Sequence, residues 1–207
     1  MNFTLQTTEG PFCYPADLAG GWGLLFYYAG DFLPVSATEL FALSALAPAL
    51  ARADCRVLAV SGDTVAVHLA FLETLNRYRL EEFPFPITLP LGADPQGQFR
   101  RALSAGPVQK YLWLVDPQGV TQAHFSWPAE TGANFTEAYR TLLALQTGRP
   151  TPAGWVPGAY TLALPPQTRK ESLEYMHKKE ESGAIAIDWY FSFETEGELN
   201  SPIGERN

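Results

Sequence analysis

The stretch WGLLFYY at residues 22–28 decides the fold, because it is a continuous apolar run that opens a repeating order of elements. A run of this kind is typical of a strand that is buried on both faces of a sheet. Two further runs share this character, RVLAVS at 56–61 and YLWLV at 111–115. Helical spacing of apolar residues separates the first two runs. The sequence therefore predicts an α/β domain in which these three runs are interior strands.

The segments around these runs predict the remaining elements of that domain. Pro48 lies inside the first expected helix and predicts a kink there. Asp63 is expected to cap the second helix, and residues 116–119 have the composition of a turn. In chain order we expect a helix over 40–53, a helix after Asp63, a strand over 86–91, a helix over 96–103, a hairpin strand over 120–125 and an amphipathic helix over 134–146.

The composition changes near residue 148, so we expect a domain over 1–148 and a C-terminal arm with an acidic tail over 149–207. Residues 149–168 contain five prolines, which favours an extended segment. A charged helix is expected over 169–181 and an aromatic strand over 185–193. The polar residues after 194 are predicted to be mobile.

Charge and composition exclude several classes of partner. The chain has 14 Lys plus Arg against 22 Asp plus Glu, a net charge of −8, whereas binding of nucleic acid needs clustered cations. His68, His124 and His177 are too far apart for metal-ligand spacing, and two cysteines cannot form a disulfide framework. We expect no cofactor. The absence of an apolar run of about 18 residues and of a signal-like start predicts a cytoplasmic protein without a membrane span.

Four pieces of sequence resemble the peroxiredoxin family. YYAGDFLPVSATEL at 27–40 is similar to its active-site loop, and CRVLAVSGDTVAVHLAF at 55–71 resembles the strand, turn and helix that follow. WLVDPQGV at 113–120 resembles the family's hairpin, and PAGWVPG at 152–158 a segment of the alkyl hydroperoxide reductase C branch, also called thiol-specific antioxidant proteins. The resemblance implies a thioredoxin-like fold, with a mixed sheet and helices on both faces.

The resemblance also implies a degenerate site. The family reduces peroxides with a cysteine thiolate in the first turn of a helix, and Ser36 occupies the matching position. Leu33 matches the threonine that orients the peroxide, and Ala29 matches the proline that shields the thiolate. Lys110 matches the arginine that polarises both, and Thr151 matches the resolving cysteine. A serine hydroxyl is not ionised near pH 7 and cannot pass through the thiol, sulfenate and disulfide cycle.

Ser36 has two further interpretations. The pattern Ser36-Ala37-Thr38-Glu39 is typical of a capping box, which predicts Ser36 as the N-cap of a helix. The alternative is an anion or small polar ligand held by Ser36, the helix N-terminus and Lys110, a cation expected at the edge of a pocket. Asp31 and Glu39 match family positions that organise the active-site loop, so a structural role is expected for both.

The cysteines and His68 leave alternatives open. Cys55 precedes a buried strand and is expected to be inert core material. Cys13 lies in the Pro-flanked stretch GPFCYP and is the candidate reactive thiol. His68 is predicted to be a packed structural residue, with a ligand role as the alternative. The aromatic strip over 189–193 is expected to pack on a partner or on the chain's own core.

Three functions follow from these observations. The first is a catalytically inactive peroxiredoxin-like protein with a binding, scaffolding or regulatory role. The second is a thiol peroxidase with a relocated nucleophile, Cys13 or Cys55, and the third is a chaperone-like oligomer. The resemblance implies a homodimer that pairs the strand over 120–125 across a two-fold axis, with the arm beyond 149 reaching over the partner. A ring of dimers is the alternative assembly.

Overall fold

The computed structural model describes residues 3–18, 20–77, 84–103, 109–182 and 186–194. The chain divides into two compact units, Met1–Tyr139 and Arg140–Asn207. The boundary between the units lies inside helix α4 (Phe135–Gln146). Each unit is described by itself.

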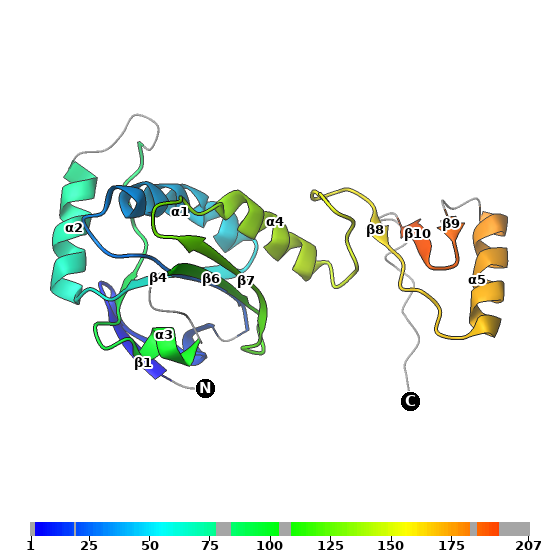
Figure 1. Ribbon diagram of the computed structural model, residues 1–207, viewed down its shortest axis with the longest axis horizontal. Helices are drawn as coiled ribbons and strands as arrows, with labels where there is room; N and C mark the ends of the chain where they lie inside the picture. Colours follow the sequence, from blue (N-terminus) through cyan, green and yellow to red (C-terminus); the bar gives the residue numbers. More distant parts are fainter. Residues whose placement is uncertain (1–2, 19, 78–83, 104–108, 183–185, 195–207) are drawn as a thin grey trace. The chain divides into compact units, whose positions relative to one another are not determined.

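The first unit is built on a seven-stranded mixed sheet with the strand order β2-β1-β5-β4-β3-β6-β7 (Figure 1). The strand β3 pairs in parallel with β4 and antiparallel with β6, so the three apolar runs of the sequence are adjacent interior strands, as predicted. The strands are β1 (Phe3–Thr7), β2 (Gly10–Tyr14), β3 (Trp22–Tyr27), β4 (Cys55–Ser61), β5 (Leu91–Ala93), β6 (Gln109–Val115) and β7 (Thr121–Pro128).

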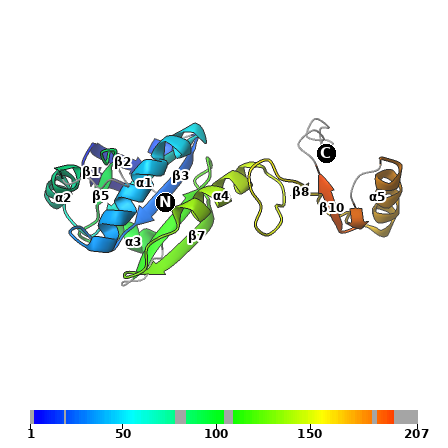
Figure 2. The ribbon, with the colours of Figure 1, turned by 90° about the horizontal axis from the view of Figure 1, so that it is seen from above.

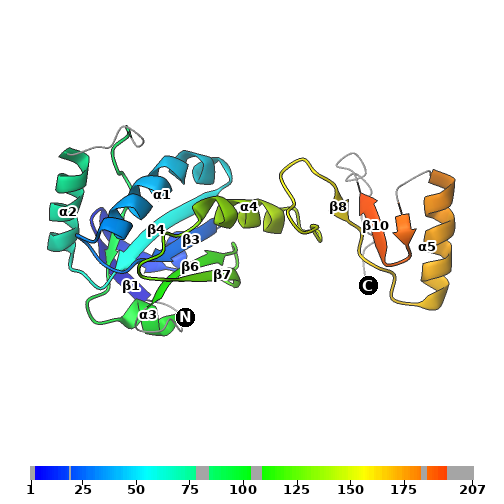
Figure 3. The ribbon, with the colours of Figure 1, turned by 45° about the horizontal axis from the view of Figure 1, so that its top comes forward.

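One face of the sheet is covered by α1 (Pro34–Arg52), α2 (Val65–Arg77) and α4 (Figure 3). The two parallel connections β3-α1-β4 and β4-α2-β5 both step in the same direction across the sheet, and right-handed crossovers then place both helices on one face. Phe26 of β3 packs edge to face on Phe135 of α4, with ring centroids 5.0 Å apart.

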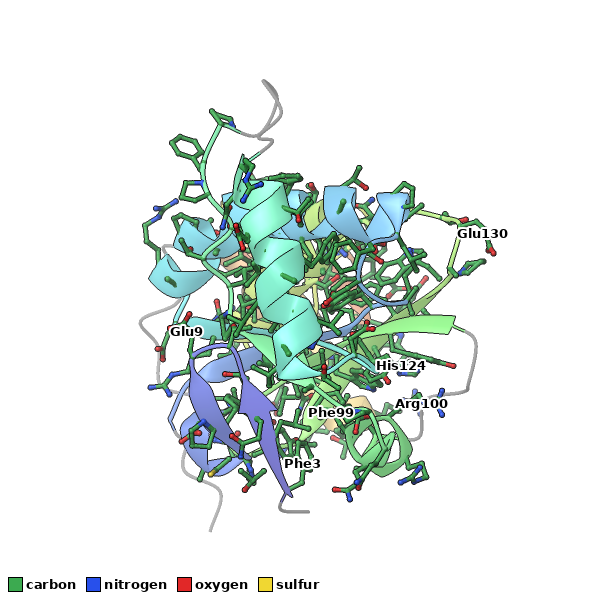
Figure 4. All side chains as sticks on the ribbon, turned by 90° about the vertical axis from the view of Figure 1, so that its left-hand side faces the viewer. Phe3, Glu9, Phe99, Arg100, His124 and Glu130 are labelled. Carbon is green, nitrogen blue, oxygen red and sulfur yellow. The ribbon has the colours of Figure 1, made fainter. Side chains whose placement is uncertain are left out.

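The opposite face carries α3 (Gln98–Ala102) and the short 3₁₀ helix η1 (Ala16–Leu18). Because successive strand residues point to opposite faces, Leu25 and Tyr27 of β3 belong to the core on this side. Phe99 of α3 is fully buried in that core and meets the ring of Phe3 edge to face at 5.1 Å (Figure 4). Helices therefore cover both faces of the sheet, as the sequence predicted.

Two predicted features of α1 are wrong. The helix begins at Pro34 rather than at residue 40, because proline is well accommodated in the first helical turn, where its missing N–H has no acceptor to lose. The N-cap is Leu33, which makes no side-chain capping bond, so Ser36 is not the N-cap. By length and composition alone α1 could cross a membrane, but Leu40, Leu43 and other residues of it are buried against the sheet, as in a core helix.

Other elements also depart from the sequence predictions. The strand expected over 86–91 is instead the short β5, because prolines at 84, 86 and 90 cannot donate to a ladder. The carboxylate of Asp63 does not cap α2; it accepts hydrogen bonds from the backbone N–H of Asp31 and the hydroxyl of Ser61, both at 2.8 Å. The hairpin of β1 and β2 had no counterpart in the sequence predictions.

The second unit contains the end of α4, the helix α5 (Arg169–Ser182) and a small antiparallel sheet, shown in Figure 2. The aromatic stretch expected as one strand is a hairpin, with Trp189 and Tyr190 exposed at its turn. The residues after 194, predicted to be mobile, lie outside the described residues. The sheet has the order β8-β10-β9, with β8 (Thr161–Leu162), β9 (Ala186–Asp188) and β10 (Phe191–Glu194).

Candidate functional site

Ser36 is the central residue of the candidate site. It lies in the first turn of α1, and its side chain is buried, with the residue 1% exposed. The first N–H groups of a helix have no intrahelical acceptor, and this end of the helix carries partial positive charge. The hydroxyl Oγ of Ser36 is buried without a hydrogen-bond partner among the described residues. Ser36 thus combines an unpaired hydroxyl with the polar end of a helix.

Glu39 and Lys110 form a buried ion pair next to it, one turn further along α1. The Nζ of Lys110 donates to Oε1 of Glu39 at 2.5 Å and to the carbonyl of Thr131 at 2.6 Å. The same Oε1 accepts the backbone N–H of Ala133 at 2.9 Å. Lys110 is 0% exposed, so it does not lie at the edge of a pocket, where the sequence placed it.

The two oxygens of Glu39 are used unequally. Oε1 accepts from both Lys110 and Ala133, whereas Oε2 is buried with no partner among the described residues. Burial raises the pKa of the Glu39 carboxyl, and the hydrogen bonds from Lys110 and Ala133 oppose that shift. An unmade hydrogen bond at a buried polar atom costs about 1–3 kcal/mol. Ser36 Oγ and Glu39 Oε2 are therefore the two unsatisfied polar atoms of this cluster among the described residues.

A second polar cluster precedes α1 and is built from Tyr28, Asp31 and His68. The Tyr28 hydroxyl donates to Oδ1 of Asp31 at 2.6 Å, and Nδ1 of His68 lies 2.7 Å from Oδ2 of Asp31. The other ring nitrogen, Nε2, lies 3.1 Å from the carbonyl of Gly92. All three side chains are buried, so every contact is made away from water. This cluster links the loop before α1 to α2 and β5.

The contacts of His68 indicate which atoms of this cluster carry protons. A carbonyl oxygen can only accept, so Nε2 carries a proton and donates it to Gly92. The contact between Nδ1 and Asp31 then needs one further proton between the two groups, and the pair is net neutral whichever group holds it. Burial, with the neighbouring Asp31 carboxylate, strongly raises the pKa of Tyr28, which stays a hydrogen-bond donor.

The loop before α1 is held from both sides. Besides its side-chain bonds, Asp31 donates its backbone N–H to Asp63 at 2.8 Å. The next residue, Phe32, has a φ of 54°, a left-handed conformation that is unfavourable for a bulky side chain. Phe32 is exposed and its ring meets Phe71 of α2 at 4.9 Å. The anchored Asp31 therefore sets the point from which α1 starts.

The other residues predicted for the site lie in the loop before α1 or in the second unit. Leu33 and Ala29 are exposed in the loop before α1. Thr151 belongs to the second unit and is half-buried. Of the candidates from the sequence, the structure brings together Ser36 with Glu39 on one helix face and Glu39 with Lys110 in an ion pair.

The two cysteines are free and differ in environment. Cys55 is buried in β4, and burial, with the nearby Asp54 carboxylate, raises the pKa of its thiol to about 12. Cys13 is half-buried in β2 rather than in an exposed loop, and its Sγ accepts a hydrogen bond from the Thr4 hydroxyl at 3.6 Å. Within the described ranges of the chain, no group of three His, Cys, Asp or Glu side chains could hold a metal ion.

Sequence reasoning missed three groups of these clusters. Tyr28 follows a buried strand directly, and its hydroxyl makes it a polar residue inside an apolar run; this was the available signal. Thr131 and Ala133 contribute only backbone atoms. Backbone contacts from a loop depend on the tertiary fold, and no residue type in the sequence predicts them.

Comparison with known proteins gives consistent matches. The profile of the AhpC/TSA family matches residues 1–124. A peroxiredoxin from Aquifex aeolicus is 31% identical, over 91% of this chain and 90% of its own length. A peroxiredoxin from Methanosarcina mazei is 28% identical, over 91% of this chain and 92% of its own length.

Solved structures match the fold as well. A yeast mitochondrial 1-Cys peroxiredoxin superimposes with a TM-score of 0.79 at 22% identity, over 94% of this chain and 96% of that one. A cysteine-to-serine mutant of peroxiredoxin 6 from Arenicola marina gives a TM-score of 0.72 at 26% identity, over 84% of this chain and 85% of that one. Both matches extend well beyond the first unit.

Proposed function

Because the chain belongs to the AhpC/TSA family of peroxiredoxins and has their thioredoxin-like fold, we propose that it is a peroxiredoxin-like protein that has lost thiol peroxidase activity and acts by binding. One observation carries the proposal: the residue in the first turn of α1, at the position that matches the family's cysteine, is the buried Ser36. A hydroxyl there supplies no nucleophile near pH 7, because only an ionised thiol is readily accessible at that pH.

The neighbours of Ser36 support the same conclusion. The side chain of Leu33 has no hydrogen-bond donor for a peroxide. Lys110 holds a single ammonium already engaged with Glu39 and Thr131, and it lacks the bidentate fork of an arginine. Stabilisation of charge on a departing oxygen needs donors aimed at that oxygen. The site therefore lacks the donors as well as the nucleophile.

A small ligand at Ser36 and Lys110 is the binding role that the sequence suggests, and the unpaired Ser36 Oγ and Glu39 Oε2 support it. Glu39 Oε2 has no hydrogen-bond partner among the described residues, and an anion would meet a carboxylate that partly cancels the Lys110 charge. A neutral hydroxylic molecule can donate to Glu39 and accept from the first turn of α1. Ligand-detected NMR with small alcohols and with phosphate distinguishes these two classes.

The relocated-thiol alternative is confined to Cys13. Cys55 is buried with a pKa of about 12, which leaves almost no thiolate near neutral pH. Cys13 is the more accessible of the two thiols. A peroxide-consumption assay with a thiol reductant tests both functions: we expect no turnover by the wild type. Turnover that disappears in Cys13→Ala would replace the proposed function by the alternative.

We propose a homodimer formed along β7, with the segment beyond residue 149 covering the partner. Among the described strands it is the last of the sheet, with β6 as its one neighbour, and an edge strand is a liability that pairing removes. Phe125 and Trp127 stack at 5.8 Å along it. Light scattering at micromolar concentration should give a dimer, and Phe125→Lys a monomer, while Glu130→Lys in the loop beyond β7 (Figure 4) leaves the mass unchanged. A larger discrete mass would indicate a ring of dimers.

Two further proposals concern the location of the protein and a chaperone-like assembly. Free thiols suit the reducing cytoplasm, so we propose that location. A chaperone-like oligomer is the remaining alternative, favoured by the large exposed apolar side chains Leu173, Ile187 and Tyr190 of the second unit. Suppression of light scattering by an aggregating client protein would favour it over a small-ligand role.

A further inference from the structure

A cavity of about 310 Å³ lies within the second unit, and nothing in the proposed function uses it. The end of α4, the segment that follows it and the end of β10 line the cavity. Its volume is at the lower end of the range of small-molecule sites, which suits a ligand of the size of an amino acid. Residues that matter for its chemistry are Leu143, Arg149, Trp155, Thr161 and Glu194.

The cavity wall contains one positive and one negative side chain. The guanidinium of Arg149 and the carboxylate of Glu194 form an ion pair, and their side chains are only 19% and 25% exposed. Charges shielded from water to this degree interact more strongly than surface charges. Arg149 and Glu194 satisfy one another in the free protein, so a ligand that binds either must replace this contact. A ligand with a single charge would leave the other partner unpaired, which is unfavourable in a partly buried site, whereas a zwitterion replaces the pair for both partners.

The rest of the wall combines the apolar Leu143, Trp155 and Ala159 with the polar Gln146, Thr147 and Thr161. Trp155 is buried, and its indole N–H already donates to the carbonyl of Ala159 at 3.1 Å. Arg140 donates to the backbone carbonyl of Trp155 at 3.2 Å, which holds the same residue from α4. Leu143 adds an aliphatic side chain from the next turn of that helix. The apolar part of the wall, with Trp155 and Leu143, lies in the same cavity as two opposite charges and is complementary to a zwitterion that carries an apolar substituent.

We propose that this cavity binds an apolar α-amino acid. Arg149 takes the carboxylate with its planar fork, Glu194 takes the ammonium group, and Trp155 and Leu143 contact the side chain. The site lies within one unit and does not depend on Ser36. It is therefore independent of the proposed function of the first unit.

Isothermal titration calorimetry with the full chain tests the proposal. The probes are L-leucine, N-acetyl-L-leucine, which has no ammonium group, and L-leucinamide, which has no carboxylate. We expect L-leucine to bind at least tenfold more tightly than either analogue. No heat of binding up to millimolar L-leucine, or equal affinity for the three probes, would overturn the proposal and leave the ion pair as a tie between Arg149 and β10.

Variants of the lining residues test whether the ligand binds in this cavity. Leu143→Trp fills the cavity without a change of charge and should abolish binding, whereas Leu143→Met should retain it. The double variant with Arg149→Gln and Glu194→Gln removes both charges and should weaken the binding of L-leucine at least tenfold. The circular dichroism melting curve of each variant identifies any that fails to fold. Binding that survives Leu143→Trp in a folded variant would place the ligand elsewhere and contradict the assignment.

Discussion

Two buried polar clusters lie on either side of the start of α1, and they differ in how completely their atoms are paired. In the cluster of Tyr28, Asp31 and His68, both carboxylate oxygens and both ring nitrogens have partners. In the cluster of Ser36, Glu39 and Lys110, one hydroxyl and one carboxylate oxygen have none among the described residues. Both clusters are equally removed from water.

The difference distinguishes a cluster that positions a loop from a cluster whose polar atoms are not all paired. The paired cluster fixes the loop from which α1 starts, and its bonds stabilise the folded state by their completeness. On the proposed function, the second cluster matches the position of the family's reactive cysteine, and Ser36 Oγ and Glu39 Oε2 in it have no partner among the described residues. The first cluster would then position a loop whose reactive group has been replaced by a serine.

The largest effect is expected from Asp31→Ala, which removes the shared partner of Tyr28 and His68. Loss of one member of a buried charged pair typically costs about 3–5 kcal/mol, and we expect a loss of that size in the free energy of unfolding. Urea denaturation measures it. Glu9→Ala at the exposed turn between β1 and β2 is the control and should change stability by less than about 0.5 kcal/mol. If Asp31→Ala lost as little stability as the control, the claim that the paired cluster stabilises the folded state would be contradicted.

The account would also fail if another thiol of the chain supplied the nucleophile that is absent at Ser36. The pKa of Cys55 is raised from 9.0 to about 12, so its thiolate population is lower by about a thousandfold. In Cys13→Ala at pH 8, alkylation of Cys55 should be at least a thousandfold slower in the native chain than in urea. Equal rates would show an accessible thiol.

The same thiol predicts a pH dependence. Below pH 9 the Cys55 thiol is protonated in both states and contributes its full stability. Between pH 9 and pH 12 it ionises in the unfolded chain first, so the free energy of unfolding should fall across this range. Cys55→Ala should flatten that fall, while Cys13→Ala should leave it unchanged.

A stepwise repair sharpens the comparison at the second cluster. In a Ser36→Cys background, Leu33→Thr and Lys110→Arg together restore a donor for the peroxide and a bidentate cation. We expect the rate of reaction with hydrogen peroxide to rise at least about tenfold over Ser36→Cys alone, because each well-placed donor contributes to the barrier. Leu33→Val with Lys110 retained is the control. No acceleration would mean that these two positions do not limit the site.

The smallest effect is expected from Ser36→Ala. Its hydroxyl is buried and unpaired, so its removal relieves a cost of about 1–3 kcal/mol that is partly offset by lost packing. Stability to urea should stay unchanged or rise slightly. A fall of more than about 1 kcal/mol would show that Ser36 makes a stabilising hydrogen bond.

The sequence predicted most of the first unit and less of the site. The strands at 22–28, 56–61 and 111–115 were predictable because interior strands need apolar residues on both faces. The start of α1 was not, because a capping-box pattern competed with Pro34, and proline at the first helical position prevailed. The Lys110–Glu39 pair joins residues far apart in the chain, so no local pattern could indicate that the lysine is buried and neutralised.

The aromatic stretch of the second unit shows the same limit. The apolar, aromatic composition predicted one strand over 185–193, but a turn at Trp189 and Tyr190 separates β9 from β10. Neither residue is a typical turn former, so the break follows from pairing of β10 with both β8 and β9.

The most direct measurement is the rate constant of Ser36→Cys with hydrogen peroxide, followed by stopped-flow tryptophan fluorescence in a chain that also carries Cys13→Ala and Cys55→Ala. The helix N-terminus should lower the pKa of the new thiol below its free value of about 8.5, so alkylation should be faster than in the denatured chain. Peroxide should nevertheless react as it does with an ordinary protein thiol, because Leu33 and Lys110 do not hold or polarise it. A rate as high as that of active peroxiredoxins would contradict the account and show that the serine alone silences an intact site.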